Sequence, residues 1–183
     1  KHVILGDNVY AMMITNGEKG NHALDKSECF ESLGKLLIPK SNILFGNFPD
    51  GFVIDNQELV DFIEKKINEF KIDKIYTHSS QDRHQDHKNV SLAVSAAARK
   101  IPALLLYQSP STLVNFEPHY FITLSNKILN QKIKALNCYK TQIDKGLDLG
   151  VMKSLAHVNG SKINAKYAEA FELNHLIVGG NYV

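Results

Sequence analysis

KIYTHSSQDRHQDHKNVSLAVSAAARKIPALLLY, residues 74–107, contains two apolar segments separated by a polar loop and an alanine-rich stretch. Short apolar runs such as 74–77 and 103–107 are typical of strands buried in a sheet, and the alanine-rich stretch 86–100 favours a helix. A strand, a helix and a second strand in this order are typical of a parallel sheet in which helices form the crossover connections. The stretch therefore predicts an α/β fold.

The same alternation continues on both sides of this stretch. The other expected strands are 9–15, 43–45, 119–124 and a short one near 176–178, and the other expected helices are 26–37, 59–70, 125–139 and 152–158. The sequence shows neither a repeat nor a linker. We therefore expect one domain over residues 1–183, with a mainly parallel sheet and helices on both of its faces. The apolar run at 9–15 predicts a strand buried on both faces.

Composition excludes several classes of protein. The formal net charge of +2 is too small to argue for binding to nucleic acid or to a membrane surface. No uninterrupted apolar run approaches the ~18 residues of a membrane-spanning helix. The cysteines, Cys29 and Cys138, lie far apart and form no disulfide framework, so they are expected to be small buried side chains. Their small number favours a reducing compartment and a cytoplasmic protein.

The beginning of the sequence departs from the alternation. Leu5-Gly6-Asp7 is typical of a helix end with Gly6 in the left-handed position, and a strand follows it. In a doubly wound domain such a helix has its own preceding strand, on the order of 20–30 residues in all. We therefore expect the sheet to lack its first strand and the chain most of its first helix. One edge of the 9–15 strand would then be unpaired, so a homo-oligomer is one expected state. The alternative is that residues 1–6 form a disordered tail.

The candidate chemistry lies at His84-Gln85-Asp86-His87, after the strand 74–77. Open α/β sheets bind their ligands at the carboxyl ends of strands. Two imidazoles three residues apart can share one face of a helix start, and neutral imidazole is a common zinc ligand. Asp86 can accept a hydrogen bond from a ring N–H. A catalytic zinc ion usually has three protein ligands, so the segment alone is an incomplete site. The alternative is a solvated helix N-terminus at which Asp86 interacts with the helix dipole.

The segment RHQDHKNV, residues 83–90, resembles the H-x-D-H signature of the PIG-L (LmbE-like) deacetylases. Other blocks agree with this family in order and spacing: 9–20 with its T-x-G-E-x-G loop, 28–34, the F-x-D-G turn at 48–51, the A-L-x-x-H-x-S-Q helix at 134–142, and Y-A-E-x-F at 167–171. The resemblance thus runs from about residue 1 to residue 171. It implies a Rossmann-like fold, one divalent metal ion that is usually zinc, and hydrolysis of the N-acetyl group of a glucosamine-type sugar.

The resemblance also implies roles for individual residues. His87 corresponds to a zinc ligand. His84 corresponds to the imidazole that stabilises the tetrahedral intermediate or protonates the leaving amine, and Asp86 orients it. Glu18 is a candidate for contact with sugar hydroxyls, with a turn-stabilising carboxylate as the alternative. Arg83 is a candidate for an anionic group of the substrate, with a solvated surface charge as the alternative.

Some positions depart from the family pattern. The family's first signature, A-H-P-D-D-E, supplies the other two ligands and the aspartate base, and residues 1–183 contain no counterpart. The match at Val9 places this signature before Lys1. Thr123 and Tyr139 stand where the family often has aspartate and histidine. These two differences concern details of the substrate pocket.

The function expected from the resemblance is that of a zinc-dependent N-deacetylase of a small amino-sugar substrate, provided that the native protein carries the first signature. Two alternatives belong to other classes. One is a catalytically inactive family member that binds a glycan or a protein partner. The other is a metal-dependent phosphohydrolase of the HD type, whose domains are all helical, so the buried strands expected at 9–15 and 103–107 argue against it.

Overall fold

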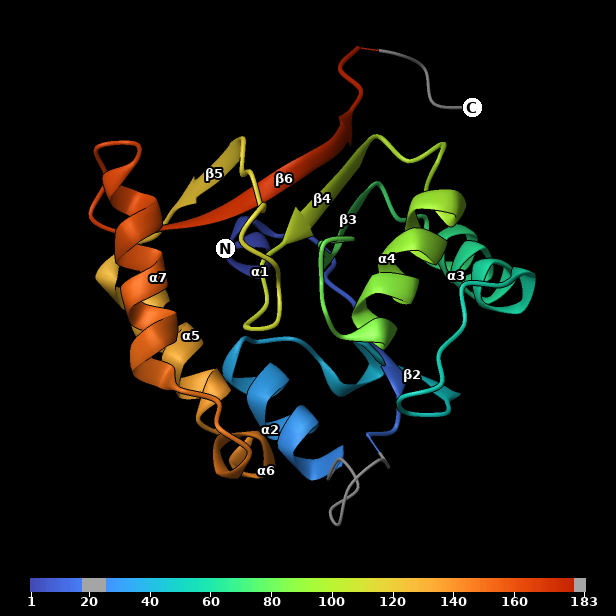
Figure 1. The fold of residues 1–183 in the computed structure, drawn as a ribbon, viewed down its shortest axis with the longest axis horizontal. Helices are drawn as coiled ribbons and strands as arrows, with labels where there is room; N and C mark the ends of the chain where they lie inside the picture. Colours follow the sequence, from blue (N-terminus) through green and yellow to red (C-terminus); the bar gives the residue numbers. More distant parts are fainter. Residues whose placement is uncertain (18–25, 180–183) are drawn as a thin grey trace. The chain divides into compact units, whose positions relative to one another are not determined.

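The computed structural model describes residues 1–17 and 26–179 and shows helices and strands that alternate as far as residue 107 (Figure 1). The helices are α1 (His2–Leu5), α2 (Lys26–Lys35), α3 (Gln57–Phe70), α4 (Gln85–Ala97), α5 (Asn126–Leu136), α6 (Lys140–Asp144) and α7 (Leu149–Ser161). The strands are β1 (Ala11–Thr15), β2 (Ile43–Phe48), β3 (Lys74–His78), β4 (Ala103–Tyr107), β5 (Tyr120–Thr123) and β6 (Ala168–Leu176). The α/β class predicted from the sequence is confirmed, and the helices and strands expected up to residue 124 occur within a few residues of their expected bounds.

Within the described ranges the strands form two sheets rather than the single sheet that was expected. One is the parallel pair β1-β2, and the other has the order β3-β4-β6-β5. β3 and β4 are parallel, with Lys74 opposite Ala103 and His78 opposite Tyr107, whereas β4 and β6 are antiparallel. All five residues of β1 are only partly buried, so the prediction of a strand buried on both faces was wrong. In the part of the chain that the structure describes, β1 has a single strand partner, β2.

The last strand lies further upstream than predicted. The sequence indicated a short strand near 176–178, but β6 covers Ala168–Leu176. Its buried positions include Ala168, Ala170 and Phe171, and its polar residues include Glu169 and Glu172. Alanine and glutamate have weak intrinsic preference for strands, so this segment is a strand because of its pairing with β4.

The described chain forms two compact units. The first contains Lys1–Asp50 and Ile122–Glu169. In its core the buried side chains of Leu33, Ile38 and Ile43 pack with partly buried residues of β1 and β2. A second cluster joins α5 to α7 through Leu124, Leu129 and Ala156.

Gly6 has φ 91° and ends α1 in the left-handed conformation, as predicted. Glu28 of α2 accepts hydrogen bonds from the backbone N–H and the hydroxyl of Thr141, at 3.1 and 2.6 Å.

The second unit contains Gly51–Phe121 and the residues from Ala170 onward. Its core is built on β4, where Leu104 and Leu105 are almost fully buried. Helix α4 packs against α3 and β3, and Ala93 is fully buried. The alanine content of α4 thus serves close packing as well as helix formation. The histidines predicted to carry the chemistry lie at the start of this helix.

Both cysteines behave as the sequence predicted. Cys29 and Cys138 are free thiols with 0% and 7% of their surface exposed. Burial raises the pKa of Cys138, and a hydrogen bond with Glu31 adds to the shift. No helix in residues 1–17 and 26–179 has the length and apolar character that crossing a membrane requires.

Gly160 provides a test of the packing at the end of α7. A Cβ atom at this buried position would lie 2.6 Å from the Ala165 carbonyl oxygen and 2.7 Å from the Tyr167 nitrogen. Because backbone cannot move aside cheaply, Gly160→Ala is expected to lower the free energy of unfolding by ~1–3 kcal/mol. Gly34→Ala is the matched control, since a Cβ there meets nothing within 4 Å. It is expected to raise the free energy by ~0.5–1 kcal/mol through helix propensity. Urea unfolding of both variants measures the difference, and a Gly160→Ala variant as stable as the wild type would contradict the packing.

Candidate active site

The candidate site lies at the carboxyl ends of two neighbouring parallel strands. β3 ends at His78 and β4 at Tyr107, which are paired in register. The loops that follow, residues 79–84 and 108–115, are joined by backbone hydrogen bonds: Ser79 N–H to Tyr107 O (3.0 Å), Arg83 N–H to Ser111 O (3.1 Å) and Leu113 N–H to Gln81 O (2.8 Å). This is the end of the sheet at which open α/β folds bind ligands.

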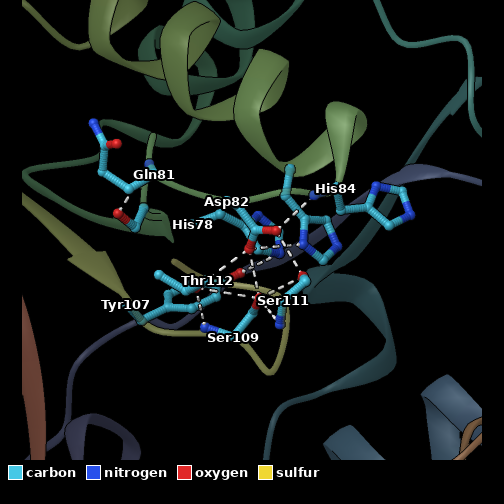
Figure 2. A network of polar contacts seen from close by, with 10 residues as sticks. His78, Gln81, Asp82, His84, Tyr107, Ser109, Ser111 and Thr112 are labelled. Atoms are coloured by element: carbon cyan, nitrogen blue, oxygen red, sulfur yellow. Dashed lines mark hydrogen bonds and ion pairs between the residues drawn. The ribbon is translucent and has the colours of Figure 1, made fainter. Parts of the chain in front are cut away.

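A buried carboxylate stands at the centre of these loops. The side chain of Asp82 is 0% exposed. Figure 2 shows polar groups of both loops converging on it, and His87 of α4 adds a further contact. They are the hydroxyls of Ser109 (2.5 Å), Ser111 (2.6 Å) and Thr112 (3.3 Å), the backbone N–H of His84 (2.9 Å) and the ring Nδ1 of His87 (3.2 Å). Burial alone would raise the pKa of Asp82. The hydrogen bonds, led by those from Ser109 and Ser111, outweigh burial and hold the pKa well below its usual range.

Asp82 and its hydroxyl partners were not predicted as site residues. Two signals in the sequence point to them. Asp82 follows the strand 74–78, and the run Ser109 to Thr112 follows the strand 103–107. Residues that follow adjacent parallel strands come together at one end of the sheet. The sequence does not say that these strands are neighbours, so the contact required the tertiary structure.

Three imidazole rings stack beside this carboxylate. The ring centroids of His78 and His87 are 3.9 Å apart, and those of His84 and His87 are 4.4 Å apart. Burial lowers the pKa of His78 to about 3, with a further contribution from the nearby His87. Burial also lowers the pKa of His87, although Asp82 opposes the shift. His78 and His87 are therefore neutral near pH 7, and neutral imidazole is the form that binds metal ions.

His78 is held by a tyrosine at the end of the adjacent strand. Its Nε2 lies 3.1 Å from the hydroxyl of Tyr107. Burial raises the pKa of Tyr107, so the hydroxyl keeps its proton. The tautomer of His78 decides which of the two groups donates this hydrogen bond. Within the described residues the buried Nδ1 of His78 has no hydrogen-bond partner. No partner of His78 was evident in the sequence, and the structure supplies one by pairing β3 with β4.

Asp86 faces a different part of the unit. The residue is 4% exposed, and its carboxylate accepts hydrogen bonds from the backbone N–H groups of Gly51 (2.6 Å) and Val53 (3.2 Å). The side chains of Gln85 and Asn89 also donate to the carbonyl groups of Gly51 and Val53. Gly51 has φ 72°, which favours glycine at this turn. Asp86 therefore fastens residues 51–53 to the first turn of α4, and its predicted role in orienting His84 stays a prediction.

The remaining site residues predicted from the sequence are His84, Arg83 and Glu18. His84 is the N-terminal cap residue of α4 and is exposed. Arg83 is exposed, in agreement with the alternative of a solvated charge, and its substrate role stays a prediction. Glu18 lies outside the described residues. The structure thus brings together His84 and His87, adds Asp82 and His78 to them, and directs Asp86 toward residues 51–53.

The donor chemistry at His87 fits one ligand of a zinc ion. A neutral ring whose Nδ1 faces a carboxylate presents its other nitrogen as a lone pair, which is the usual arrangement of a metal-binding histidine. Among residues 1–17 and 26–179, however, no group of three His, Cys, Asp or Glu side chains is arranged to hold a metal ion. The described residues therefore fit part of a zinc site.

Comparisons with known proteins identify related sequences. The sequence model of the PIG-L family, described as GlcNAc-PI de-N-acetylase, matches residues 1–98. The uncharacterized deacetylase YaiS of Escherichia coli (strain K12) is 37% identical over 84 residues, which are 45% of this chain and 45% of that protein. The match thus spans less than half the length of this relative.

Solved structures share the fold. The conserved protein TT1542 from Thermus thermophilus superposes with a TM-score of 0.84 at 19% identity, over 98% of this chain and 87% of its own. The N,N'-diacetylchitobiose deacetylase from Pyrococcus horikoshii gives 0.77 at 19% identity, over 94% and 74%. The 4-carboxy-2-hydroxymuconate hydratase from Pseudomonas putida KT2440 gives 0.80 at 14% identity, over 98% and 89%. Because a deacetylase and a hydratase share the fold, the fold by itself does not determine the reaction.

Proposed function

Because this chain belongs to the PIG-L (GlcNAc-PI de-N-acetylase) family, we propose that it is an N-deacetylase that hydrolyses the N-acetyl group of an N-acetylglucosamine-type sugar or glycoconjugate with the help of zinc. The observation that carries the proposal is the position of His84 and His87. The two rings stack at the start of α4, and His87 is backed by the buried carboxylate of Asp82. Free amine and acetate would be the products.

In this proposal His87 binds the metal ion and His84 acts on the substrate. When bound, a zinc ion would supply a water molecule with a pKa of ~7 and would polarise the acetyl carbonyl. His84 is exposed at the N-terminal cap of α4, where a substrate can reach it. In its protonated form it stabilises the negative charge that develops on the acetyl oxygen, or it passes a proton to the leaving amine. Catalytic zinc ions usually have three protein ligands, so the activity requires further ligands besides His87, which the family's first signature would supply.

Residues 1–183 would act as one deacetylase domain, and the likeness to TT1542 over 98% of the chain supports a single shared fold over this length. A small amino-sugar substrate is the proposed partner. The two free, buried cysteines support a reducing compartment such as the cytoplasm. Self-association stays a prediction. The strands that the structure contains argue against the all-helical phosphohydrolase alternative.

Acetate release tests the proposed reaction. The complete protein, loaded with zinc, is incubated with N-acetylglucosamine, N,N'-diacetylchitobiose and an N-acetylglucosaminyl lipid, and acetate and free amine are measured separately. We expect equal amounts of both products from at least one substrate, loss of activity with a chelator, and recovery when zinc is added. A protein that binds these sugars and retains zinc but releases no acetate would be the inactive family member instead.

A further inference from the structure

The contacts of the buried Asp82 carboxylate support an inference that goes beyond the roles proposed for His84 and His87. Its two oxygens have different partners. Oδ1 accepts from the Ser111 hydroxyl and the His84 backbone N–H. Oδ2 accepts from the Ser109 and Thr112 hydroxyls and faces Nδ1 of His87. We call Ser109, Ser111 and Thr112 the hydroxyl cage.

The cage makes an ionised carboxylate stable in a buried position. Burying a charge is costly unless hydrogen bonds compensate for it. Here the compensation comes from the cage and from the His84 backbone, so that both oxygens are satisfied. Backbone hydrogen bonds already join the two loops, for example from Leu113 N–H to Gln81 O. Joining the loops 79–84 and 108–115 therefore does not by itself require the buried charge of Asp82.

The contact that depends on the negative charge of Asp82 is the one with His87. An ionised carboxylate only accepts hydrogen bonds, so the proton of the neutral ring must lie on Nδ1 when this nitrogen faces Oδ2 at 3.2 Å. Nε2 then carries the lone pair. The opposite tautomer would place the lone pair of Nδ1 against a negative oxygen. Asp82 therefore selects one of the two tautomers of His87 and fixes the direction of its ring.

We propose that Asp82 is the positioning residue of His87, held in place by the hydroxyl cage, and that it keeps the ring in the Nδ1–H tautomer with Nε2 directed to the ligand position. Asp82 acts through His87 and not on the substrate. The tautomer assignment stands on the geometry of Asp82 and His87, whereas its use for metal binding rests on the proposed function.

An asparagine at position 82 distinguishes this role from that of a neutral loop contact. Asparagine has one acceptor oxygen, and its NH2 group only donates. If the oxygen faces the His84 N–H, the NH2 group faces Nδ1 of His87 and favours the Nε2–H tautomer. If the oxygen faces His87, the NH2 group faces the His84 N–H, and two hydrogen-bond donors then point at each other. Asp82→Asn is therefore expected to change the His87 tautomer while preserving the volume of the side chain.

The tautomer is measured directly by NMR. Long-range 1H–15N correlation spectra of the 15N-labelled protein at about pH 7.5 separate Nδ1–H from Nε2–H rings, and the spectrum of His87→Gln assigns the signal. We expect wild-type His87 to be Nδ1–H and Asp82→Asn to give the Nε2–H form or a mixture. An Nε2–H ring in the wild type would overturn the proposal, and this result does not depend on the folding of Asp82→Asn.

Asp86→Asn is the matched control. It also removes a buried carboxylate near the start of α4, but the carboxylate of Asp86 accepts the backbone N–H groups of Gly51 and Val53. We expect its His87 to stay Nδ1–H, with circular dichroism of both variants like that of the wild type. An equal change of tautomer in the two folded variants would show a general effect of lost charge and would count against Asp82 as the specific partner.

Zinc affinity connects the inference to the proposed function. Loss of the hydrogen-bond partner of a metal-binding histidine typically lowers metal affinity by ~10–100-fold, and we expect this for Asp82→Asn in the complete protein, measured by competition with a chelator. A changed tautomer without any effect on zinc would leave Asp82 as the partner of His87 and contradict His87 as a ligand. Deacetylase activity in a protein whose wild-type His87 is Nε2–H would support the function and overturn the positioning role.

Discussion

His87→Ala is expected to abolish zinc binding and deacetylase activity together. A catalytic zinc ion depends on each of its few protein ligands, and His87 is the neutral, partly buried imidazole backed by Asp82. Metal content per chain after dialysis and the rate of acetate release are measured on the same preparation. The variant should contain much less than one zinc ion per chain, with no detectable acetate.

The control for this variant is His119→Ala. His119 is an exposed histidine that lies outside the stacked rings. Its replacement should leave both the zinc content and the rate of acetate release like those of the wild type. A His87→Ala protein that keeps one zinc ion per chain and full activity would show that His87 is not a ligand.

His84→Ala is expected to keep the zinc ion and to lose rate. The ring of His84 stacks on His87 from the exposed N-terminal cap of α4, so its removal leaves His87 and Asp82 in place. A general acid or base contributes typically ~10²–10⁴-fold, and a fall of this size in kcat is expected. Steady-state acetate release and the zinc content of the same sample provide the measurement.

Asp86→Asn is expected to show an intermediate rate of acetate release in the same assay. If Asp86 orients His84, the rate should lie between those of the wild type and His84→Ala. The reversed pattern, in which His84→Ala loses zinc and His87→Ala retains it, would exchange the two roles. If neither histidine variant changes the activity, the segment 84–87 is a helix start only and the deacetylase proposal fails.

Local patterns in the sequence determined the helices and strands. The strand 103–107 and the helix at 85–97 follow from runs of apolar and alanine residues whose character does not depend on distant partners. The left-handed Gly6 is equally local, because only its own φ and the preceding helix are involved. The positions of His84 and His87 at a helix start after a strand were predicted for the same reason. The resemblance to the family added the chemistry that these local patterns lack.

The pairing of strands was predicted less well. β6 is antiparallel to β4 although its alanines and glutamates do not favour a strand, and the strands divide into two sheets within the described ranges. The hydrogen bonds that make such a segment a strand come from residues far away in the chain. A single sequence carries little information about which distant segments pair.

In the candidate site, too, some features follow from local sequence and others depend on the pairing of distant segments. An imidazole pair at the carboxyl end of a strand could be predicted from residues 74–100, since this needs only the local order of strand, loop and helix. The support of His87 by Asp82 could not be predicted in this way, because the hydroxyls that make the charge of Asp82 stable follow a different strand and reach it through the pairing of β3 with β4. The partners of Asp86 were decided in the same way, since residues 51–53 are distant in sequence from α4. A buried charge is stable only where several donors converge on it, and that convergence is a property of the folded chain.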